Sequence, residues 1–559
     1  MNKIISFCPP LDRAIIIVLL TVIPSTAPAI AQIDTTWVRR YDGNLYLDDY
    51  ATAMTVDNAG NVYLTGASNG SYGPDIVTIK YFASGDTAWI KRYNGPADST
   101  DRASDIAVDQ FGNVYVTGLS YRHSTYRDYL TIKYSPAGDT IWTRSYDGSD
   151  DYCDDDFPVA IAADNSGNIY VTGSCIDFDC NRNIVTIKYN SDGDSIWIER
   201  YDGEENGNDI ARAMVIDGLG NVYIIGSSWS TVTGPDYLTI KYNNDGEIAW
   251  VKRYCGPDSL NLGGDYSEAI EVDQFGNVYV TGYSKGIYTN MDCTTIKYLA
   301  NGDADWVRTF SCDGAHWDGG VDIDIDDSGF VYVFGETYSD STNRDYLTIK
   351  YSGDGDTEWI RIFDGDGNYQ DFGRSLAIDQ AGNVFVTGSS CVERYDWDYT
   401  TVMYYPDGTL GWVVTYDGNR GDDDATEIVL DSMGDIYITG SSIGDNYDYD
   451  YATIKYHQTQ VGLEETVVSR QYRSINLWQN SPNPFNPTTT IGYSLKESCA
   501  ISLSVYSLLG QRVATVFEAV QEAGEHSVTW DASVFPSGVY FARLEAGGRS
   551  ENVKMVLLK

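Results

Sequence analysis

The amino-acid sequence predicts an all-β protein: an eight-bladed β-propeller closed by an N-terminal strand, followed by a small β-sandwich. Three observations lead to this prediction. A glycine in a signature close to G-N-(V/I)-Y recurs with a period of about 53 residues. Four short runs rich in β-branched and aromatic residues follow one another within each period. A last segment lacks the repeat but again alternates like short strands.

One repeat unit, from Asp105 to Gly148, shows how a blade is encoded. Its strands are expected at Ile106–Val108, Asn113–Gly118, Tyr129–Tyr134 and Ile141–Tyr146. The links D-x-x-G-N and x-x-x-G-D suit tight hairpins in which glycine takes a positive φ. Each unit is therefore predicted to be a four-stranded antiparallel meander, and stacking such sheets around an axis buries both faces.

The strand count indicates how the ring closes. The first three strands of the unit occur eight times, and so does the fourth, W-x-x-x-(Y/F). The chain opens with an orphan fourth strand at Thr35–Gly43, and its last unit stops at Tyr456 without one. We expect the N-terminal strand to complete the last blade, because this removes open sheet edges.

The chain divides into four predicted segments. A signal peptide is expected over 1–31. It is indicated by the basic residues Lys3 and Arg13, the apolar run Ala14–Ile23 and small residues up to Ala31. No segment reaches the ~20 apolar residues of a spanning helix, so no membrane span is expected after cleavage. The propeller is predicted over 32–457, a linker over 458–473 and a C-terminal domain over 474–559.

Composition restricts the class of partner. Lys and Arg number 37 against 81 Asp and Glu, a net charge of −44 that lies almost wholly in the propeller. This balance excludes nucleic acid as a favoured ligand and disfavours anionic membranes, since both require basic surfaces. Cations and neutral glycans remain compatible, and solubility outside the cell is the simpler explanation of the charge.

The two ends of the propeller are expected to differ. The turns inside the hairpins are short and similar in every unit, whereas the 2–3 loops and the blade-to-blade loops are long, acidic or aromatic. Binding groups usually lie on such loops of a rigid scaffold, so we place the ligand surface at this long-loop end. The candidates for stacking on a sugar or another partner are Trp229, Trp317, Trp397, Tyr121 and Tyr395. Each could instead cover the end of its own blade.

A calcium site is a further possibility. Oxygen-bearing side chains occur at alternate positions in Asp364, Asp366 and Asn368, and Asp371 follows them. This pattern approximates the alternate-residue oxygen ligation of Ca²⁺. The segment lacks the glycine and the distal glutamate of an EF-hand loop, and a solvated acidic loop is the alternative. No other cofactor is expected.

Catalytic signals are weak. The chain has four His, and it contains no H-E-x-x-H, G-x-S-x-G or phosphate-binding loop, so no catalytic residue is predicted. The lysine of the repeated T-I-K-Y run, present in seven blades and replaced by Met403 in one, is interpreted as structural. It is expected to pair with an Asp or to lie over a Tyr or Trp ring.

The motifs D-x-x-G-N-V-Y-V-T-G and D-Y-x-T-I-K-Y resemble the bacterial β-propeller repeat named for seven-bladed propellers. The resemblance covers roughly Asp49 to Tyr456 and departs from the name in its eight units.

The C-terminal motifs SPNPFNPTT, LLGQRV, AGEHSVTWDA, PSGVYFARL and KMVLLK closely resemble the type A sorting domain of the type IX secretion system. The resemblance implies an immunoglobulin-like sandwich read by an outer-membrane translocon, and export through the periplasm to the cell surface or beyond. The terminal strand is the natural candidate for the sorting signal, at Lys554, Met555, Val556, Leu557, Leu558 and Lys559.

Three functions remain open. The first is a secreted or surface binding protein whose long-loop end holds a glycan or a protein. The second is an extracellular hydrolase or lyase acting on polysaccharide, which carboxylates in a deep central pocket would favour. The third is a structural component of the surface or matrix.

Overall fold

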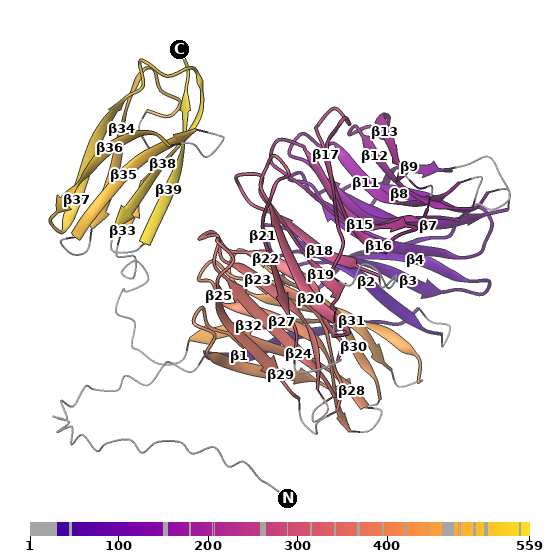
Figure 1. Cartoon of the computed structure of the whole chain (residues 1–559). Coiled ribbons are helices and arrows are strands. Elements are labelled where there is room, and N and C mark those ends of the chain that lie inside the picture. Colours follow the sequence, from indigo (N-terminus) through magenta and orange to yellow (C-terminus); the bar gives the residue numbers. More distant parts are fainter. Residues whose placement is uncertain are drawn as a thin grey trace, which may run out of the picture.

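A computed structural model gives the architecture of the chain (Figure 1). It describes residues 31–43, 47–123, 125–148, 155–177, 180–203, 205, 207–257, 264–287, 289–312, 316–339, 343–365, 369–393, 396–418, 421–444, 447–460, 475–478, 480, 482–495, 499–507, 512–546 and 549–559. The predicted signal peptide, apart from Ala31, and most of the predicted linker lie outside these residues. Among the described residues, no helix has the length and apolar character needed to cross a membrane.

Eight four-stranded antiparallel sheets form the blades, which confirms the predicted count. Blades 1 to 4 contain β2 (Asp49–Val56), β3 (Val62–Asn69), β4 (Pro74–Tyr81) and β5 (Thr87–Tyr93); β6 (Asp101–Val108), β7 (Val114–Arg122), β8 (Tyr126–Tyr134) and β9 (Thr140–Tyr146); β10 (Asp156–Ala163), β11 (Ile169–Ile176), β12 (Arg182–Tyr189) and β13 (Ser195–Tyr201); and β14 (Asp209–Ile216), β15 (Val222–Ser230), β16 (Gly234–Tyr242) and β17 (Ile248–Tyr254).

The remaining blades repeat the same order. Blades 5 to 8 contain β18 (Tyr266–Val272), β19 (Val278–Lys285), β20 (Met291–Tyr298) and β21 (Ala304–Phe310); β22 (Asp318–Ile325), β23 (Val331–Ser339), β24 (Asn343–Tyr351) and β25 (Thr357–Phe363); β26 (Asp371–Ile378), β27 (Val384–Glu393), β28 (Asp396–Tyr404) and β29 (Leu410–Tyr416); and β30 (Asp423–Leu430), β31 (Ile436–Ile443), β32 (Tyr449–Gln460) and β1 (Ala31–Tyr41).

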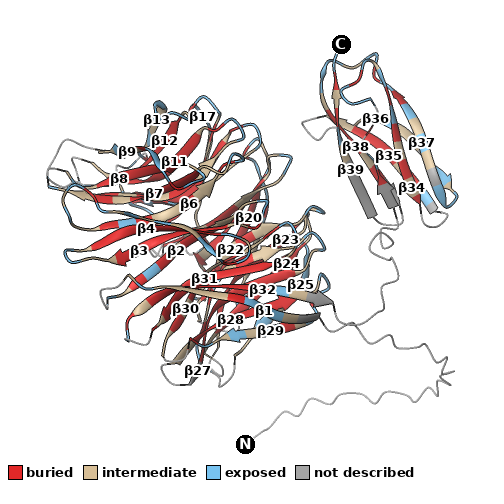
Figure 2. Cartoon of the chain, turned by 180° about the vertical axis from the view of Figure 1, so that it is seen from behind, coloured by how far each residue is buried: buried red, intermediate tan, exposed pale blue. Residues whose placement is uncertain are grey.

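The N-terminal strand takes the fourth position of blade 8. β1 pairs antiparallel with β32 from Ala31 opposite Gln460 to Tyr41 opposite Tyr451. The first strands of adjacent blades contact one another around the ring, β30 contacting β2, and so they surround the central channel. Figure 2 shows buried residues concentrated along the strands of the blades.

The D-x-x-G-N signature builds the turn between the first and second strands. In blade 2, Asp109 accepts hydrogen bonds from the backbone N–H groups of Phe111 and Asn113, both at 2.9 Å. Its other oxygen accepts from the Asn113 amide at 2.7 Å and the Tyr115 hydroxyl at 3.0 Å. Gly112 has φ of 78°, a conformation that favours glycine. One aspartate therefore explains why D, G, N and Y recur together.

A second repeated contact joins neighbouring blades and accounts for the T-I-K-Y lysine. In blade 2, the Lys133 Nζ atom lies 5.2 Å from the centre of the Tyr115 ring and donates to the Ser191 carbonyl of the next blade at 2.9 Å. The Trp142 Nε1–H group donates to the same carbonyl at 3.1 Å. The corresponding contacts recur in the other blades that carry the lysine, and the lysine is therefore structural as predicted.

The described residues between Ile475 and Lys559 form a β-sandwich. One sheet has the order β33 (Ile475–Leu477), β34 (Thr488–Leu495) and β37 (Gly524–Asp531). The other has the order β36 (Arg512–Gln521), β35 (Cys499–Ser507), β38 (Gly538–Ala546) and β39 (Arg549–Leu557). Tyr493, Leu503, Trp530, Leu544 and Met555 are among the buried residues of its core.

Candidate functional site

The long-loop end of blades 5 to 7 carries a continuous row of stacked side chains. Trp317, just before β22, packs on Tyr283 of β19 with ring centres 5.5 Å apart. The Arg344 guanidinium of β24 lies 4.9 Å from the centre of the Trp317 ring and 4.7 Å from that of Phe372 on β26. Phe372 in turn packs on Trp397 of β28 at 4.9 Å. With Tyr266, which lies 5.3 Å from Tyr283, these residues are named the aromatic–arginine row.

A buried acid fixes the arginine of the row. Glu336, whose side chain is 4% exposed, lies 3.2 Å from the Arg344 guanidinium. Burial raises the pKa of Glu336 to about 7, while the charges of Arg344 and Arg374 act in the opposite direction. The four aromatic rings nearest Arg344 along the row are half-buried, so their packing holds them in place while part of each surface stays accessible.

The structure brings two of the five predicted aromatic candidates together. Trp317 and Trp397 belong to the row, whereas Trp229 lies apart on β15, 39% exposed and over Gly207. Tyr121 meets His123 and Tyr126 edge-on in blade 2, at 6.3 and 6.1 Å. Tyr395 lies outside the described residues.

Sequence reasoning missed Arg344, Phe372 and Tyr283. Phe372 directly follows the aspartate at the start of its first strand, and aromatic residues follow the corresponding aspartate in blades 1, 3 and 5 as Tyr50, Phe157 and Tyr266. This recurrence was the signal that could have identified it. The sequence contains no such signal for Arg344, because its role depends on contacts with rings from two neighbouring blades.

Aspartates collect at the junctions between blades beneath the long loops. An aspartate near the start of a third strand faces the aspartate that begins or just precedes the first strand of the next blade. Two residues of the predicted calcium segment, Asp364 and Asp371, lie in such a group with Asp345, with one ligand atom of each within 4.8 Å of the others. Asp366 and Asn368 lie outside the described residues. Acidic groups of this kind could hold a metal ion.

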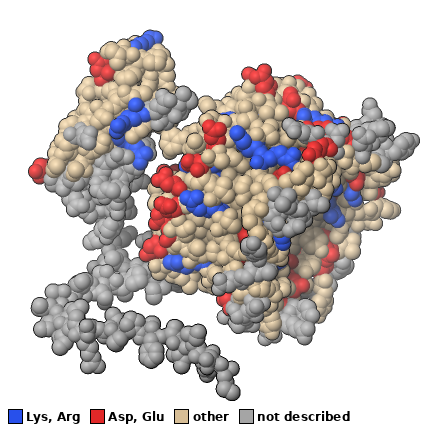
Figure 3. Space-filling view, in the orientation of Figure 1, with Lys and Arg blue, Asp and Glu red and all other residues tan. Residues whose placement is uncertain are grey.

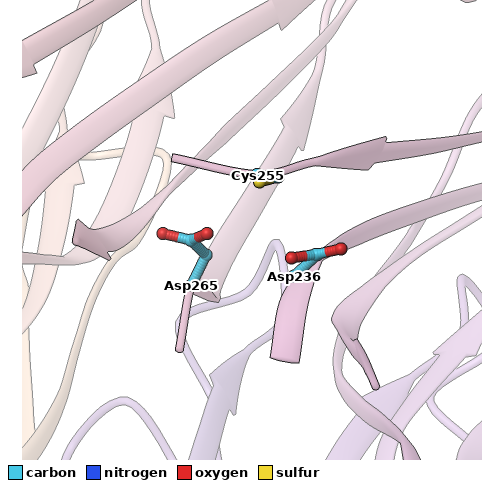
Figure 4. Close-up of side chains that lie close together, drawn as sticks. All are labelled: Asp236, Cys255 and Asp265. Atoms are coloured by element: carbon cyan, nitrogen blue, oxygen red, sulfur yellow. The ribbon is translucent and has the colours of Figure 1, made fainter. Parts of the chain in front are cut away.

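A cysteine takes the third place at one junction. Figure 4 shows Cys255 above the carboxylates of Asp236 and Asp265. Elsewhere, Cys175 has a free thiol that lies buried in blade 3, where desolvation raises its pKa well above the usual range.

Five acids follow the β-bulge of the first strands that surround the channel. They are Asp105, Glu271, Asp322, Asp324 and Glu427. Asp105 and Asp322 accept hydrogen bonds from the backbone N–H of Ile161 and Leu376 in the next blade, at 2.8 and 2.7 Å. A β-bulge between the third and fifth positions of these strands directs the fifth side chain toward the neighbouring blade.

Desolvation inside the ring raises the pKa of every one of these acids. The pKa is raised to about 6 for Asp322, about 7 for Asp105 and Asp324, and about 8 for Glu271 and Glu427. At Glu427, repulsion from Asp105 of blade 2 and Asp322 of blade 6 adds to the effect of burial. Some of these groups can therefore carry a proton near neutral pH.

The terminal strand is partly buried. Met555 and Leu557 of β39 lie in the sandwich core, while Lys554, Leu558 and Lys559 are exposed. The segment before β34 flanks this strand, since the Phe485 N–H donates to the Val556 carbonyl and the Leu558 N–H to the Phe485 carbonyl, both at 2.9 Å.

Charge is mixed over the visible surface. Figure 3 shows Asp and Glu spread over the propeller with Lys and Arg between them. The row therefore lies on a scaffold that is acidic as a whole, which matches the net charge of the sequence.

Family models match both parts of the chain. A Beta-propeller repeat model matches residues 36–73, 88–121, 154–174, 200–232, 253–289 and 358–392. A Secretion system C-terminal sorting domain model matches residues 481–558. No curated protein matches the chain closely enough to count as a relative.

Solved structures match the chain at low sequence identity. Sqt1 from Chaetomium thermophilum is 10% identical with a TM-score of 0.49, covering 76% of this chain and 100% of its own. The WD40 domain of SCAP from fission yeast is 10% identical with a TM-score of 0.41, covering 76% and 98%. The polysaccharide lyase Uly1 is 10% identical with a TM-score of 0.39, covering 72% and 89%.

Proposed function

We propose that this chain, which carries β-propeller repeats and a type IX sorting domain for export to the cell surface or secretion, is a glycan-binding protein. The aromatic–arginine row is the binding surface. The single observation that carries this proposal is the convergence of Trp317 and Trp397 on one stacked row at the long-loop end.

The chemistry of the row suits an uncharged or weakly acidic sugar chain. Aromatic faces pack on the apolar C–H faces of sugar rings, and the Arg344 N–H groups can donate to hydroxyl or carboxylate oxygens. Arg344 is already oriented by Glu336, so little side-chain entropy is lost when a ligand binds. The row crosses three blades, which fits an extended ligand.

The test is binding of the full-length exported protein to a panel of immobilised and soluble glycans. Replacing either Trp317 or Trp397 by Ala should weaken binding about 2- to 12-fold, which corresponds to one aromatic contact of ~0.5–1.5 kcal/mol. Trp229→Ala is the matched control, because that ring lies outside the row. Equal losses in all three variants, or glycan binding that no row variant changes, would contradict the proposal.

Recognition for export is proposed to involve the exposed residues of the terminal segment. Lys554, Leu558 and Lys559 are accessible, whereas Met555 and Leu557 support the core. Replacing the three exposed residues by Ala should leave the protein in the periplasm without unfolding the sandwich. Normal export of a folded variant would remove this assignment.

A hydrolase or lyase is the second candidate, and the channel acids favour it. Groups with pKa values raised to about 7 or 8 can act as general acids on a polysaccharide. Release of new reducing or unsaturated ends from a bound glycan, lost in Glu427→Gln but not in Trp397→Ala, would support this candidate. Binding without any product would leave the binding function alone.

A further inference from the structure

The junctions between blades repeat one arrangement, and the blade 4 junction shows how its charge is offset. Asp236 lies near Asp265 and Cys255 (Figure 4). The Arg253 guanidinium of β17 donates to Asp236 at 2.9 Å, and the Thr233 hydroxyl donates to the same carboxylate at 2.9 Å. The chain itself therefore supplies the positive charge at this junction.

The same pairing occurs in other blades. Arg92 of β5 lies 2.7 Å from Asp75 in blade 1, and Arg40 of β1 lies 3.0 Å from Asp450 in blade 8. Arg40, Arg92 and Arg253 occupy the same position of the fourth strand, three residues after its Trp. A buried carboxylate needs such a partner, because loss of hydration is otherwise uncompensated.

Blade 7 has three acids at its junction and no arginine at that position. Asp398, Asp417 and Asp423 each place a carboxylate oxygen within 4.8 Å of the others. The fourth strand, β29, has Thr415 at the position where four of the other fourth strands have arginine, namely Arg40, Arg92, Arg200 and Arg253. Arg40 lies near enough for its charge to favour ionised Asp423, but its N–H groups donate to Asp450, Ser442 and Tyr416.

Two of these carboxylates are deeply buried. Asp398 is 8% exposed and Asp423 is fully buried, and the Oδ1 atom of Asp398 has no hydrogen-bond partner among the described residues. Asp423 accepts from the Gly418 N–H and also interacts with the Ser442 hydroxyl. Each neighbouring charge acting on Asp398 is another carboxylate, from Asp396, Asp417 or Asp423. A buried acceptor in this state, surrounded by other carboxylates, is a position that a cation can occupy.

We propose that a calcium ion binds between blades 7 and 8, held by Asp398, Asp417 and Asp423. Oxygen-only ligands suit a hard cation, and Ca²⁺–O distances of ~2.3–2.6 Å allow opposite ligands to lie up to ~5 Å apart. The smaller Mg²⁺ demands shorter, near-octahedral distances. Waters and backbone carbonyls would complete the shell.

The ion would link three strands. Asp398 lies in β28, Asp417 directly follows β29 and Asp423 begins β30 of the next blade. Asp398 also follows Trp397, the last ring of the aromatic–arginine row. Calcium at this junction therefore fixes the blade 7 end of the row. The group of Asp345, Asp364 and Asp371 has Ile362 in the arginine's place and offers the same ligand chemistry one blade earlier.

The test counts bound calcium per full-length chain by equilibrium dialysis with radioactive calcium after treatment with a chelator. Thr415→Arg supplies, at an exposed position, the arginine that four of the other fourth strands have, and Asp398→Asn removes one ligand. Each should bind one calcium fewer than the wild type. Asp236→Asn is the matched control. It should bind as many calcium ions as the wild type, because the Arg253 guanidinium already supplies the positive charge at that junction.

Thermal unfolding provides a second readout. Chelation should lower the Tm of the wild type more than that of Thr415→Arg, since only a folded site gains from the ion. If Asp398→Asn fails to fold, the calcium count and the Tm shift of Thr415→Arg alone test the proposal. A wild type without bound calcium, or a folded Thr415→Arg chain that binds as many ions as the wild type, would overturn the proposal.

Discussion

Replacing Glu427 by Gln should change how the stability of the propeller depends on pH. Burial raises the pKa of Glu427 to about 8, and Asp105 and Asp322 add repulsion. In the unfolded chain the pKa is near 4.3. The folded state holds the proton on the Glu427 carboxyl group more tightly than the unfolded chain does. The stabilisation from this proton is therefore complete below pH ~4 and is lost as the pH rises toward 8.

The expected magnitude follows from the shift. One pKa unit corresponds to ~1.36 kcal/mol, and between pH 6 and 8 the folded protein keeps most of the proton that the unfolded chain has lost. Glu427 alone should therefore lower the free energy of unfolding by about 2 kcal/mol over this range. Glutamine cannot ionise, and its amide oxygen can still accept from the Met54 N–H.

Urea unfolding at pH 6, 7 and 8 measures this difference. Between pH 6 and 8, the free energy of unfolding of the Glu427→Gln chain should rise by about 2 kcal/mol relative to that of the wild type. Glu358→Gln, an exposed change of the same chemistry on β25, is the control and should follow the wild type. Parallel pH profiles for Glu427→Gln and the wild type would refute the reasoning.

Three further perturbations test the blades. Lys350→Met removes the bond from Nζ to the Pro406 carbonyl and the contact with the Tyr332 ring, and should cost about 1–3 kcal/mol in urea unfolding; no change would show that the lysine contributes nothing. Gly226→Ala places a Cβ atom 1.9 Å from the Ile210 carbonyl and should cost about 1–3 kcal/mol, whereas Gly218→Ala, in open space, should unfold like the wild type in the same assay. Deleting residues 31–41 exposes the edge of β32 and should cause aggregation visible by light scattering; a monomeric, stable deletion variant would contradict this role of β1.

Much of the fold was predictable because its signals are local. The D-x-x-G-N turn, the strand-four Trp and the orphan strand at the N-terminus are enough to predict the blade count from the residues alone. The bulge in each first strand left no mark in the pattern, because it is a property of pairing between strands.

The site was predictable only in part. Trp317 and Trp397 stood out as aromatic residues in variable loops, but their connection through Arg344 and Phe372 depends on packing across blades. The channel acids replace residues that are Ala in several other units, as at Asp105 against Ala53, so aligning the repeats would have revealed them. The missing arginine at Thr415 is visible in the same alignment, but its meaning depends on where Asp398 lies.

The most direct test of the proposed function is a crystal structure of the full-length chain with the tightest-binding glycan of the panel. The account predicts sugar rings on the aromatic–arginine row, in contact with Trp317, Arg344 and Trp397. A glycan seated in the central channel beside Glu427, or on the short-turn end of the propeller, would contradict it.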